Sequence, residues 1–229
     1  MINSDLAVEF ASDCVVEQPD EEKVNSLVKR VEVTDKSVFS DRCGIYYDIL
    51  VSENVVEVEN SVAKCILEYK YNREKLLFVG LGNAKYISDA LGELVLDNLP
   101  EPHKKMAKFK PQVSKLTGIQ SHDLIMAAKK IIKPTLIIAI DSLATSDISK
   151  VGKSIQITNV GLAPASGLGI ARKVLTAKNL GVPILAIGVP LVANVNIKGS
   201  NRLVIPIDIE DIAQNLAKAI ANGITQILN

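Results

Sequence analysis

Apolar runs alternate with amphipathic stretches along most of the chain. The runs LLFVGL, TLIIAI and VPILAI predict buried strands at Leu76–Leu81, Thr135–Ile140 and Val182–Ile187. Strands that alternate with helices are typical of an α/β fold, here a largely parallel twisted sheet flanked by helices. Helical spacing of apolar residues predicts helices at Ser88–Leu99 with Ser88 as the cap, at Ser121–Ile132 with Ser121 as the cap, at Ala171–Asn179, and at Ile209–Leu228.

The first part of the chain is less regular. Residues 1–43 form the most polar segment, and Glu17–Arg30 predicts a short helix that starts near Asp20. The pattern that follows predicts strands at Gly44–Val51 and Val55–Val58, joined by a turn, and then a helix at Asn60–Tyr71.

Two shorter segments complete the pattern. Ser154–Thr158 alternates between apolar and polar residues like an edge strand, and Leu203–Ile207 predicts a short strand interrupted by Pro206. The sequence has no internal repeat and no linker rich in Pro, Gly or Ser. The simplest organisation is therefore a single domain over residues 1–229.

Charge and composition narrow the function classes. Lys+Arg and Asp+Glu both number 26, so the chain has no net positive charge that would attract nucleic acid. The basic stretch His103–Lys110 is predicted to be a solvated loop or helix face. The longest apolar run, Pro134–Ile140, stops at Asp141, so we expect no membrane span. The odd, scattered cysteines and the charged N-terminus predict a cytoplasmic protein with reduced thiols.

Two aspartates stand out at predicted element boundaries. Asp141 directly follows an apolar strand, where a carboxylate is costly to desolvate unless it is paired or hydrogen-bonded. Asp89 lies at the start of a predicted helix, where a carboxylate also suits the helix dipole. In α/β sheets, catalytic groups collect at the carboxyl ends of the strands. Each residue has an ordinary alternative role, Asp89 as a helix-start carboxylate and Asp141 as a turn cap.

Other catalytic chemistries have little support. Gly80-Leu81-Gly82 lacks the third glycine of a dinucleotide-binding loop, and no GxSxG motif occurs. The histidines, His103 and His122, lie in polar settings, and Cys65 sits among apolar residues as a core thiol. The sequence therefore predicts neither a metal nor a cofactor.

Several motifs follow one another along the chain. Gly80–Leu99 contains GLGN and DALG, and Ile137–Ala144 reads IIAIDSLA. Taken in order, these motifs resemble those of the germination protease family of spore-forming bacteria, in which the second segment reads AIDALA. Further similarity to that family lies at Ser4–Glu9, Leu116–Ile125, Ser154–Gly169 and Gly181–Val192.

The resemblance implies an atypical aspartic endopeptidase with a phosphorylase/hydrolase-like fold. It implies that small acid-soluble spore proteins are hydrolysed during germination, without a cofactor, by an enzyme made as a zymogen and assembled as a tetramer. Asp89 and Asp141 match the positions of the family's two proposed catalytic aspartates. We take Asn83, Ser88, Ser142 and Ser166 as substrate-binding or supporting residues.

Departures from the family pattern leave alternatives open. Ala163 and Ala165 replace an expected His and Gly, Asn194 replaces an expected Asp, and a family-type propeptide is expected to be missing or very short. These changes motivate an alternative, a catalytically weak or inactive relative with a binding or regulatory role. A nickel-dependent, hydrogenase-maturation type of peptidase is less favoured, because neither histidine occupies a fixed position of the matching motifs.

Overall fold

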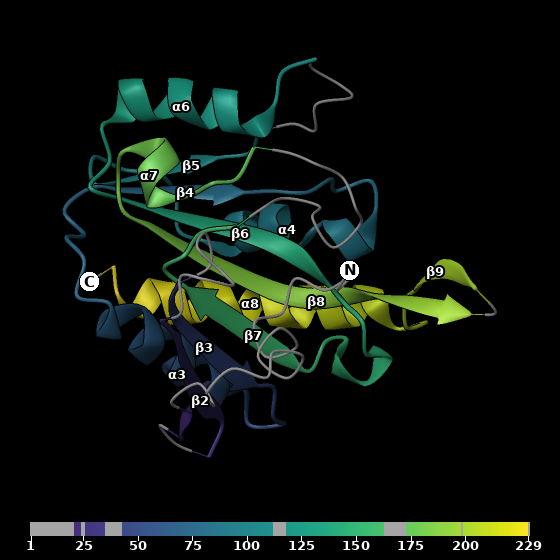
Figure 1. Ribbon diagram of the computed structural model, residues 1–229. Helices are drawn as coiled ribbons and strands as arrows, with labels where there is room; N and C mark the ends of the chain where they lie inside the picture. Colours follow the sequence, from purple (N-terminus) through teal and green to yellow (C-terminus); the bar gives the residue numbers. More distant parts are fainter. Residues whose placement is uncertain are drawn as a thin grey trace.

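The computed structural model describes the chain at residues 21–23, 26–34, 43–111, 118–162, 173–197 and 199–228. Its strands form one sheet in the order β1-β2-β3-β7-β8-β6-β4-β5, with β9 paired to β8 outside this path (Figure 1). The strands are β1 (Glu21–Lys23), β2 (Val28–Val33), β3 (Gly44–Leu50), β4 (Leu76–Gly80), β5 (Met106–Phe109), β6 (Leu136–Thr145), β7 (Ser154–Thr158), β8 (Ile184–Ile197) and β9 (Ser200–Val204).

The sheet has a parallel half and an antiparallel half that meet at β8. Strands β5, β4, β6 and β8 pair in parallel, as expected for strands connected through helices. On the other edge of β8, β7, β3, β2 and β1 pair in antiparallel fashion. The predicted α/β class, with a twisted sheet flanked by helices, is confirmed.

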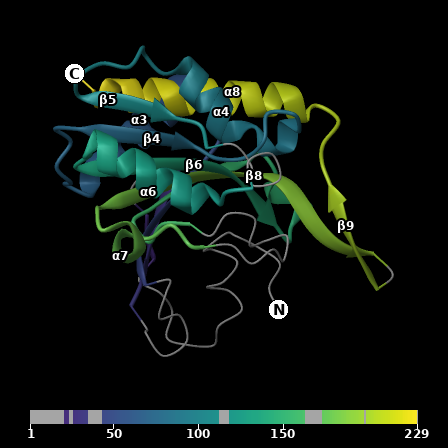
Figure 2. The ribbon, with the colours of Figure 1, turned by 90° about the horizontal axis from the view of Figure 1, so that it is seen from above.

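Helices cover the two faces of the sheet unequally (Figure 2). Helices α3, α4 and α8 pack on one face, the helical face, over strands from both halves. Helices α6 and α7 pack on the opposite, second face over the parallel half. The helices are α3 (Val55–Glu68), α4 (Leu91–Asn98), α6 (Ser121–Ile132), α7 (Ala177–Leu180) and α8 (Ile209–Gln226), with short 3-10 helices η1 (Ile87–Asp89) and η2 (Ile148–Lys150).

The parallel strands are apolar on both faces. In β4, Leu76 and Phe78 point to the helical face, whereas Leu77 and Val79 point to the second face, and all four side chains are buried. This follows from the two-residue period of a strand between two helical layers. The apolar runs that predicted these strands are therefore explained by double-sided burial.

Two predictions for the N-terminal part are wrong. Val55–Val58 begins helix α3 and is not a strand, because Asn54 caps the helix by accepting a hydrogen bond from Glu57 N, and Val58 and Val62 then face the core one turn apart. The helix predicted within Glu17–Arg30 is also absent from the described residues, where β1 and the start of β2 lie instead.

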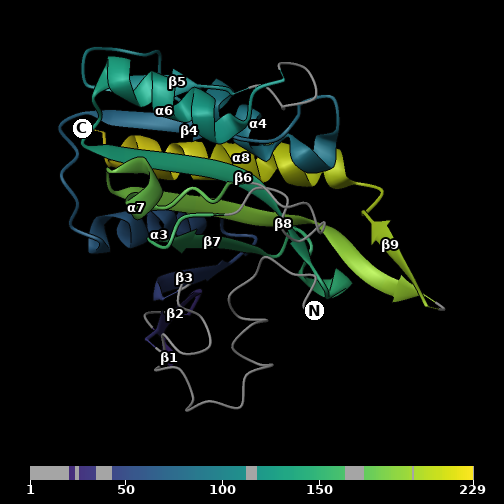
Figure 3. The same ribbon diagram turned by 45° about the horizontal axis from the view of Figure 1, so that its top comes forward.

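Strands β6 and β8 run farther than the sequence predicts. β6 continues past Ile140 to Thr145, and β8 continues to Ile197, because the two strands pair with each other beyond the end of β4. The last residues of β8 then pair with β9 in an arm that projects from the body (Figure 3). Asp141 consequently lies within a strand, at the level where β4 stops.

Three further assignments change. β7 is an interior strand between β3 and β8, so its predicted place at an edge is wrong. β5 forms one edge of the sheet and buries Met106, so the basic stretch His103–Lys110 is an exposed turn followed by an edge strand, and is not a helix face. Helix α7 begins at Ala177, later than the predicted Ala171, and ends at Leu180, one residue beyond the predicted Asn179, because Thr176 caps it and Gly181 ends it in the left-handed conformation.

The helices described here include none that is long and apolar enough to cross a membrane.

Candidate functional site

The loop after β4 is shaped by a glycine. Gly82 has φ +98°, and a Cβ at this position would collide with the carbonyl oxygen of Asp89. The same carbonyl accepts a hydrogen bond from Asn83 N at 2.8 Å. The Oδ1 atom of Asp89 lies 3.1 Å from where a Cβ of Gly82 would be. The glycine therefore allows the loop to fold back and hold Asp89, which is partly exposed, beside the end of β4.

Two more glycines bring helix α4 against the sheet. A Cβ on Gly80 would collide with the carbonyl of Gly92, and one on Gly92 would collide with the backbone of Leu81 and lie 2.6 Å from Ile140 O. Backbone thus packs on backbone where α4 begins. The GLGN and DALG motifs have this physical basis, since any larger residue would push the helix away from the sheet.

Ser88 does not cap helix α4 as predicted. It lies in η1, and the helix begins after Ala90, which offers no side-chain cap. The Leu91 N–H instead donates to Ser142 Oγ on β6, at 3.4 Å. Ser142 therefore links the strand that carries Asp141 to the helix that follows Asp89.

Asp141 is buried on the second face of the sheet. Its side chain is 5% exposed, and its Oδ1 accepts a hydrogen bond from Ser142 N at 3.0 Å. Strand alternation places Asp141 on the same face as Ile137 and Ala139. It is opposite Gly188 of β8, whose missing side chain leaves room that the Leu143 side chain fills.

The two aspartates lie on neighbouring segments. Leu81 N donates to Ile140 O at 2.8 Å, which fixes the chain just before Gly82 beside the residue that precedes Asp141. The 3-10 helix that carries Asp89 has Cα atoms within 8 Å of β6 and β8. The loop that carries Asp89 and the residue of β6 that is Asp141 thus both follow the carboxyl end of the β4–β6 pairing, the edge of an α/β sheet where ligands commonly bind.

The other predicted site residues have different positions. Asn83 shapes the loop, because its Oδ1 accepts from Lys85 N and its carbonyl from Tyr86 N. Asn194 lies on β8 opposite Leu203 of β9, about 20 Å along the strand from Gly188 at ~3.3 Å per residue. Ser166, Ala163 and Ala165 lie outside the described residues.

Cys65 is buried and His103 is exposed, as the sequence predicts, whereas the His122 side chain is only 15% exposed. His122 Nδ1 lies 3.0 Å from Asp123 Oδ1 near the surface, and Lys173 is 2.8 Å from the same oxygen. The pKa of Asp123 is lowered, first by the hydrogen bond from Lys173 and then by that from His122. Burial raises the pKa of the Cys65 thiol to about 12. In the described ranges, no group of three or more His, Cys, Asp or Glu side chains could hold a metal ion.

One polar residue on the same face of the sheet as Asp141 was missed from the sequence. Asp48 lies within β3 (GIYYDIL) between the buried residues Tyr47 and Ile49, which face the helical core. It therefore points to the second face, as Asp141 does. The available signal was a charged residue between two apolar residues of a predicted strand. Such alternation predicts that one face of the strand is buried and the other is polar.

Comparison with known proteins adds independent evidence. A family model described as germination protease matches residues 48–198, which is more than half of the chain. A germination protease from Bacillus licheniformis is 36% identical over 163 residues, covering 64% of this chain and 44% of that protein. One from Bacillus cytotoxicus is 30% identical over 206 residues, covering 79% and 56%, and one from Bacillus velezensis is 39% identical over 132 residues, covering 52% and 36%.

The chain spans about half the length of the first two of these relatives. The matched region contains Asp89, Asp141, Gly188 and the glycine-rich loop after β4. Apart from Ser4–Glu9, the motifs that carried the resemblance lie within the region that the family model recognises, and the chain belongs to the germination protease family.

Proposed function

We propose that this chain is an endopeptidase of spore germination, with Asp89 and Asp141 as its catalytic carboxylates. The observation that carries the proposal is the loop geometry at one sheet edge. Gly82 holds Asp89 beside the end of β4, and the Leu81–Ile140 hydrogen bond holds that loop beside Asp141. Family membership and the names of the relatives support peptide hydrolysis as the reaction.

The chemistry follows from two neighbouring carboxyl groups. Two carboxylates at close range share one proton, because ionising both is unfavourable. The ionised group removes a proton from a water molecule, whose oxygen then attacks the peptide carbonyl. The protonated group donates its proton to the carbonyl oxygen and, when the tetrahedral intermediate breaks down, a proton passes to the leaving amine. The buried position of Asp141 and the partly exposed position of Asp89 give the two groups different solvation.

The test is cleavage of a small acid-soluble spore protein, the substrate class that we propose. The purified parent chain is compared with Asp89→Asn and Asp141→Asn, which keep the shape of each side chain but not its acid–base function. We expect the parent to cleave and each variant to be at least about 100-fold slower, the usual contribution of a general acid or base. Asp97→Asn, at an exposed helix residue 2.5 Å from Lys110, is the matched control and should retain the parent's rate.

The outcomes separate the candidate functions. Cleavage at the parent's rate by a variant that combines Asp89→Asn and Asp141→Asn would show that these two residues are not the catalytic pair. An inactive parent that still binds the spore protein would favour the binding or regulatory alternative. The position of Asn194, far along β8 from the level of Asp141, does not support that alternative. Activity that disappears with EDTA would indicate a metal-dependent peptidase.

The family resemblance also leads us to propose a homo-oligomer. Size-exclusion chromatography with light scattering measures the mass directly, and a monomeric mass across the working concentration range would contradict this part of the proposal.

A further inference from the structure

A row of residues connects Asp141 with the far side of the sheet. Strand register places Asp141 opposite Gly188, Gly188 opposite Gln156, Gln156 opposite Asp48, and Asp48 opposite Lys29. Residues that are directly opposite on adjacent strands point to the same face. Four polar side chains and one glycine therefore form a line across β6, β8, β7, β3 and β2.

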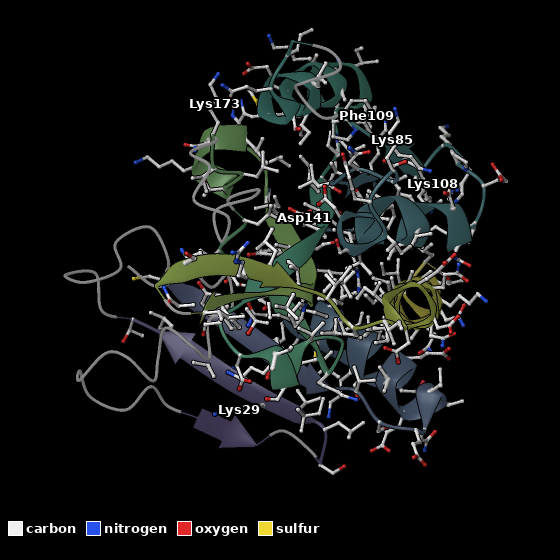
Figure 4. All side chains as sticks on the ribbon, turned by 90° about the vertical axis from the view of Figure 1, so that its right-hand side faces the viewer. Lys29, Lys85, Lys108, Phe109, Asp141 and Lys173 are labelled. Atoms are coloured by element: carbon white, nitrogen blue, oxygen red, sulfur yellow. The ribbon has the colours of Figure 1, made fainter. Side chains whose placement is uncertain are left out.

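This row lies on the second face of the sheet. Its strand neighbours Ile140, Ile187, Ile157, Tyr47 and Val28 all belong to the core beneath α3, α4 and α8. The row must therefore face away from that core. Figure 4 shows Asp141 near the middle of the molecule and Lys29 on β2 below it.

The second face changes character along the row. Over the parallel half it carries apolar residues such as Leu77 and Ile137, which pack under α6 and α7. On β7 it carries Ser154, Gln156 and Thr158, which are buried, with Gln156 only 4% exposed. An amphipathic helix needs apolar side chains to pack on, whereas buried polar side chains suit a ligand rich in hydrogen-bonding groups. A polypeptide main chain is such a ligand.

Asp48 holds an unused acceptor in this row. Its Oδ1 atom is buried and accepts no hydrogen bond from the described residues. Burial raises the pKa of Asp48, while a hydrogen bond from Ser154 and the charges of Lys150 and Lys29 act in the opposite direction. A buried acceptor without a donor is costly, and a donor from a bound ligand would remove that cost. The two lysines disfavour a cation beside Asp48, so a neutral N–H or O–H donor is the better match.

The spacing of the row agrees with an extended peptide. Adjacent strands are about 4.8 Å apart, so Asp48 is about 14 Å from Asp141 across three strand intervals. An extended chain advances about 3.3 Å per residue, so about four residues span this separation.

We propose that Asp48 forms a distal substrate-binding subsite, in which it accepts a hydrogen bond from a neutral donor on the bound polypeptide about four residues from the cleaved bond. This inference rests on the proposed peptidase function, since it takes Asp141 as the point of cleavage. Asp48 is a specificity residue in this scheme and takes no part in the bond-breaking steps.

The experiment uses peptides that span a cleavage site of a small acid-soluble spore protein. Long peptides extend six residues on both sides of the cleaved bond, and short peptides extend two. The parent should cleave long peptides with the higher kcat/KM. Asp48→Leu should lose about tenfold in kcat/KM on long peptides, as expected for a lost hydrogen bond to a carboxylate, and should match the parent on short ones. Asp48→Asn, which keeps an acceptor oxygen, should lie between the two.

Other outcomes would overturn the subsite. If Asp48→Leu lowers kcat/KM equally for long and short peptides, or lowers it for neither, Asp48 does not form a distal subsite. The peptidase assignment would stand in both cases. If the parent cleaves nothing, the proposed function fails, and the subsite is judged from fluorescence anisotropy of a labelled long peptide. Equal affinity for the parent and Asp48→Leu would then refute it. Thermal melting checks the fold, and Asp48→Ala replaces Asp48→Leu if the latter does not fold.

Discussion

The two halves of the sheet bury their apolar side chains in different ways. The parallel half is sandwiched between helices, and its strands are apolar on both faces. The antiparallel half has its large core only on the helical face, and its second face carries a small cluster of Val31 and Tyr46 next to polar residues of β7. The proposed catalytic aspartates lie in the parallel half, whereas the proposed subsite extends over the antiparallel half.

The largest expected effect comes from Gly92→Val, which tests the close packing of α4 on the parallel half of the sheet. Added side-chain atoms would collide with the backbone of Leu81 and Ile140, so we expect a loss of about 3 kcal/mol or more in the free energy of unfolding and loss of peptidase activity. Gly199→Ala is the control in the β8–β9 arm. Its Cβ meets nothing within 4 Å, and its φ of +81° should cost only about 1 kcal/mol. Urea denaturation measures both, and equal losses would contradict a tight contact at Gly92.

A matched pair of valines compares the second face of each half. Val79 in β4 and Val31 in β2 are both fully buried, but Val79 belongs to the larger cluster under α6 and α7. We expect Val79→Ala to lower the free energy of unfolding by about 2–3 kcal/mol and Val31→Ala by about 1 kcal/mol, because a cavity in the smaller cluster relaxes more easily. A larger loss for Val31→Ala would mean that the antiparallel half is the better packed of the two.

Much of this contrast was accessible from the sequence, but not all of it. Continuous apolar runs predicted the parallel strands, since burial on both faces leaves no polar positions. The strand predicted at Val55–Val58 failed because Val, Glu and Val alternate there, although Asn54 starts a helix whose packing overrides that local pattern. The extension of β6 past Asp141 depends on pairing with β8, residues far away in sequence, which no local window contains.

The candidate site was predictable only in part. The apolar strand that precedes Asp141 indicated this residue as a candidate, whereas Asp89 was indicated mainly by its match to the DALG motif. The roles of Gly82 and Gly92 depend on backbone contacts that spacing alone does not reveal. The row from Asp141 to Lys29 depends on strand order, in which β7 lies between β8 and β3, and the sequence pattern instead predicted β7 at an edge.

A smaller effect concerns Asp48 and pH. Its folded-state pKa is raised above the ordinary value of 3.8, so the folded state binds the proton more tightly than the unfolded state. The ionised carboxylate therefore destabilises the fold at neutral pH, and this penalty fades as pH falls through the folded-state pKa towards 3.8. We expect Asp48→Asn to raise the melting temperature at pH 7 and this gain to shrink as the pH falls towards 3.8. A gain that grows with acidification would mean that the pKa is lowered instead.

The smallest perturbation compares two thiols. Cys65 on α3 is 2% exposed and its pKa is raised to about 12 by burial, whereas Cys43 next to β3 is only partly buried. At pH 8 we expect iodoacetamide to modify Cys43 and to leave Cys65 unmodified until denaturant is added. Mass spectrometry of peptides locates the label, and equal rates at both positions in the native protein would contradict the buried position of Cys65.

The place of β7 in the sheet also has a kinetic consequence. Parallel pairing of Gly80 with Ile140 closes a loop of 60 residues (140 minus 80), whereas pairing of Asp48 with Gln156 closes one of 108 (156 minus 48). Longer loops cost more conformational entropy to close, so contacts that are distant in sequence tend to form late. During refolding, pulsed hydrogen exchange should therefore show amides of β4 and β6 protected before those of β3. The polar row would then be assembled in the last step, when β3 joins β7.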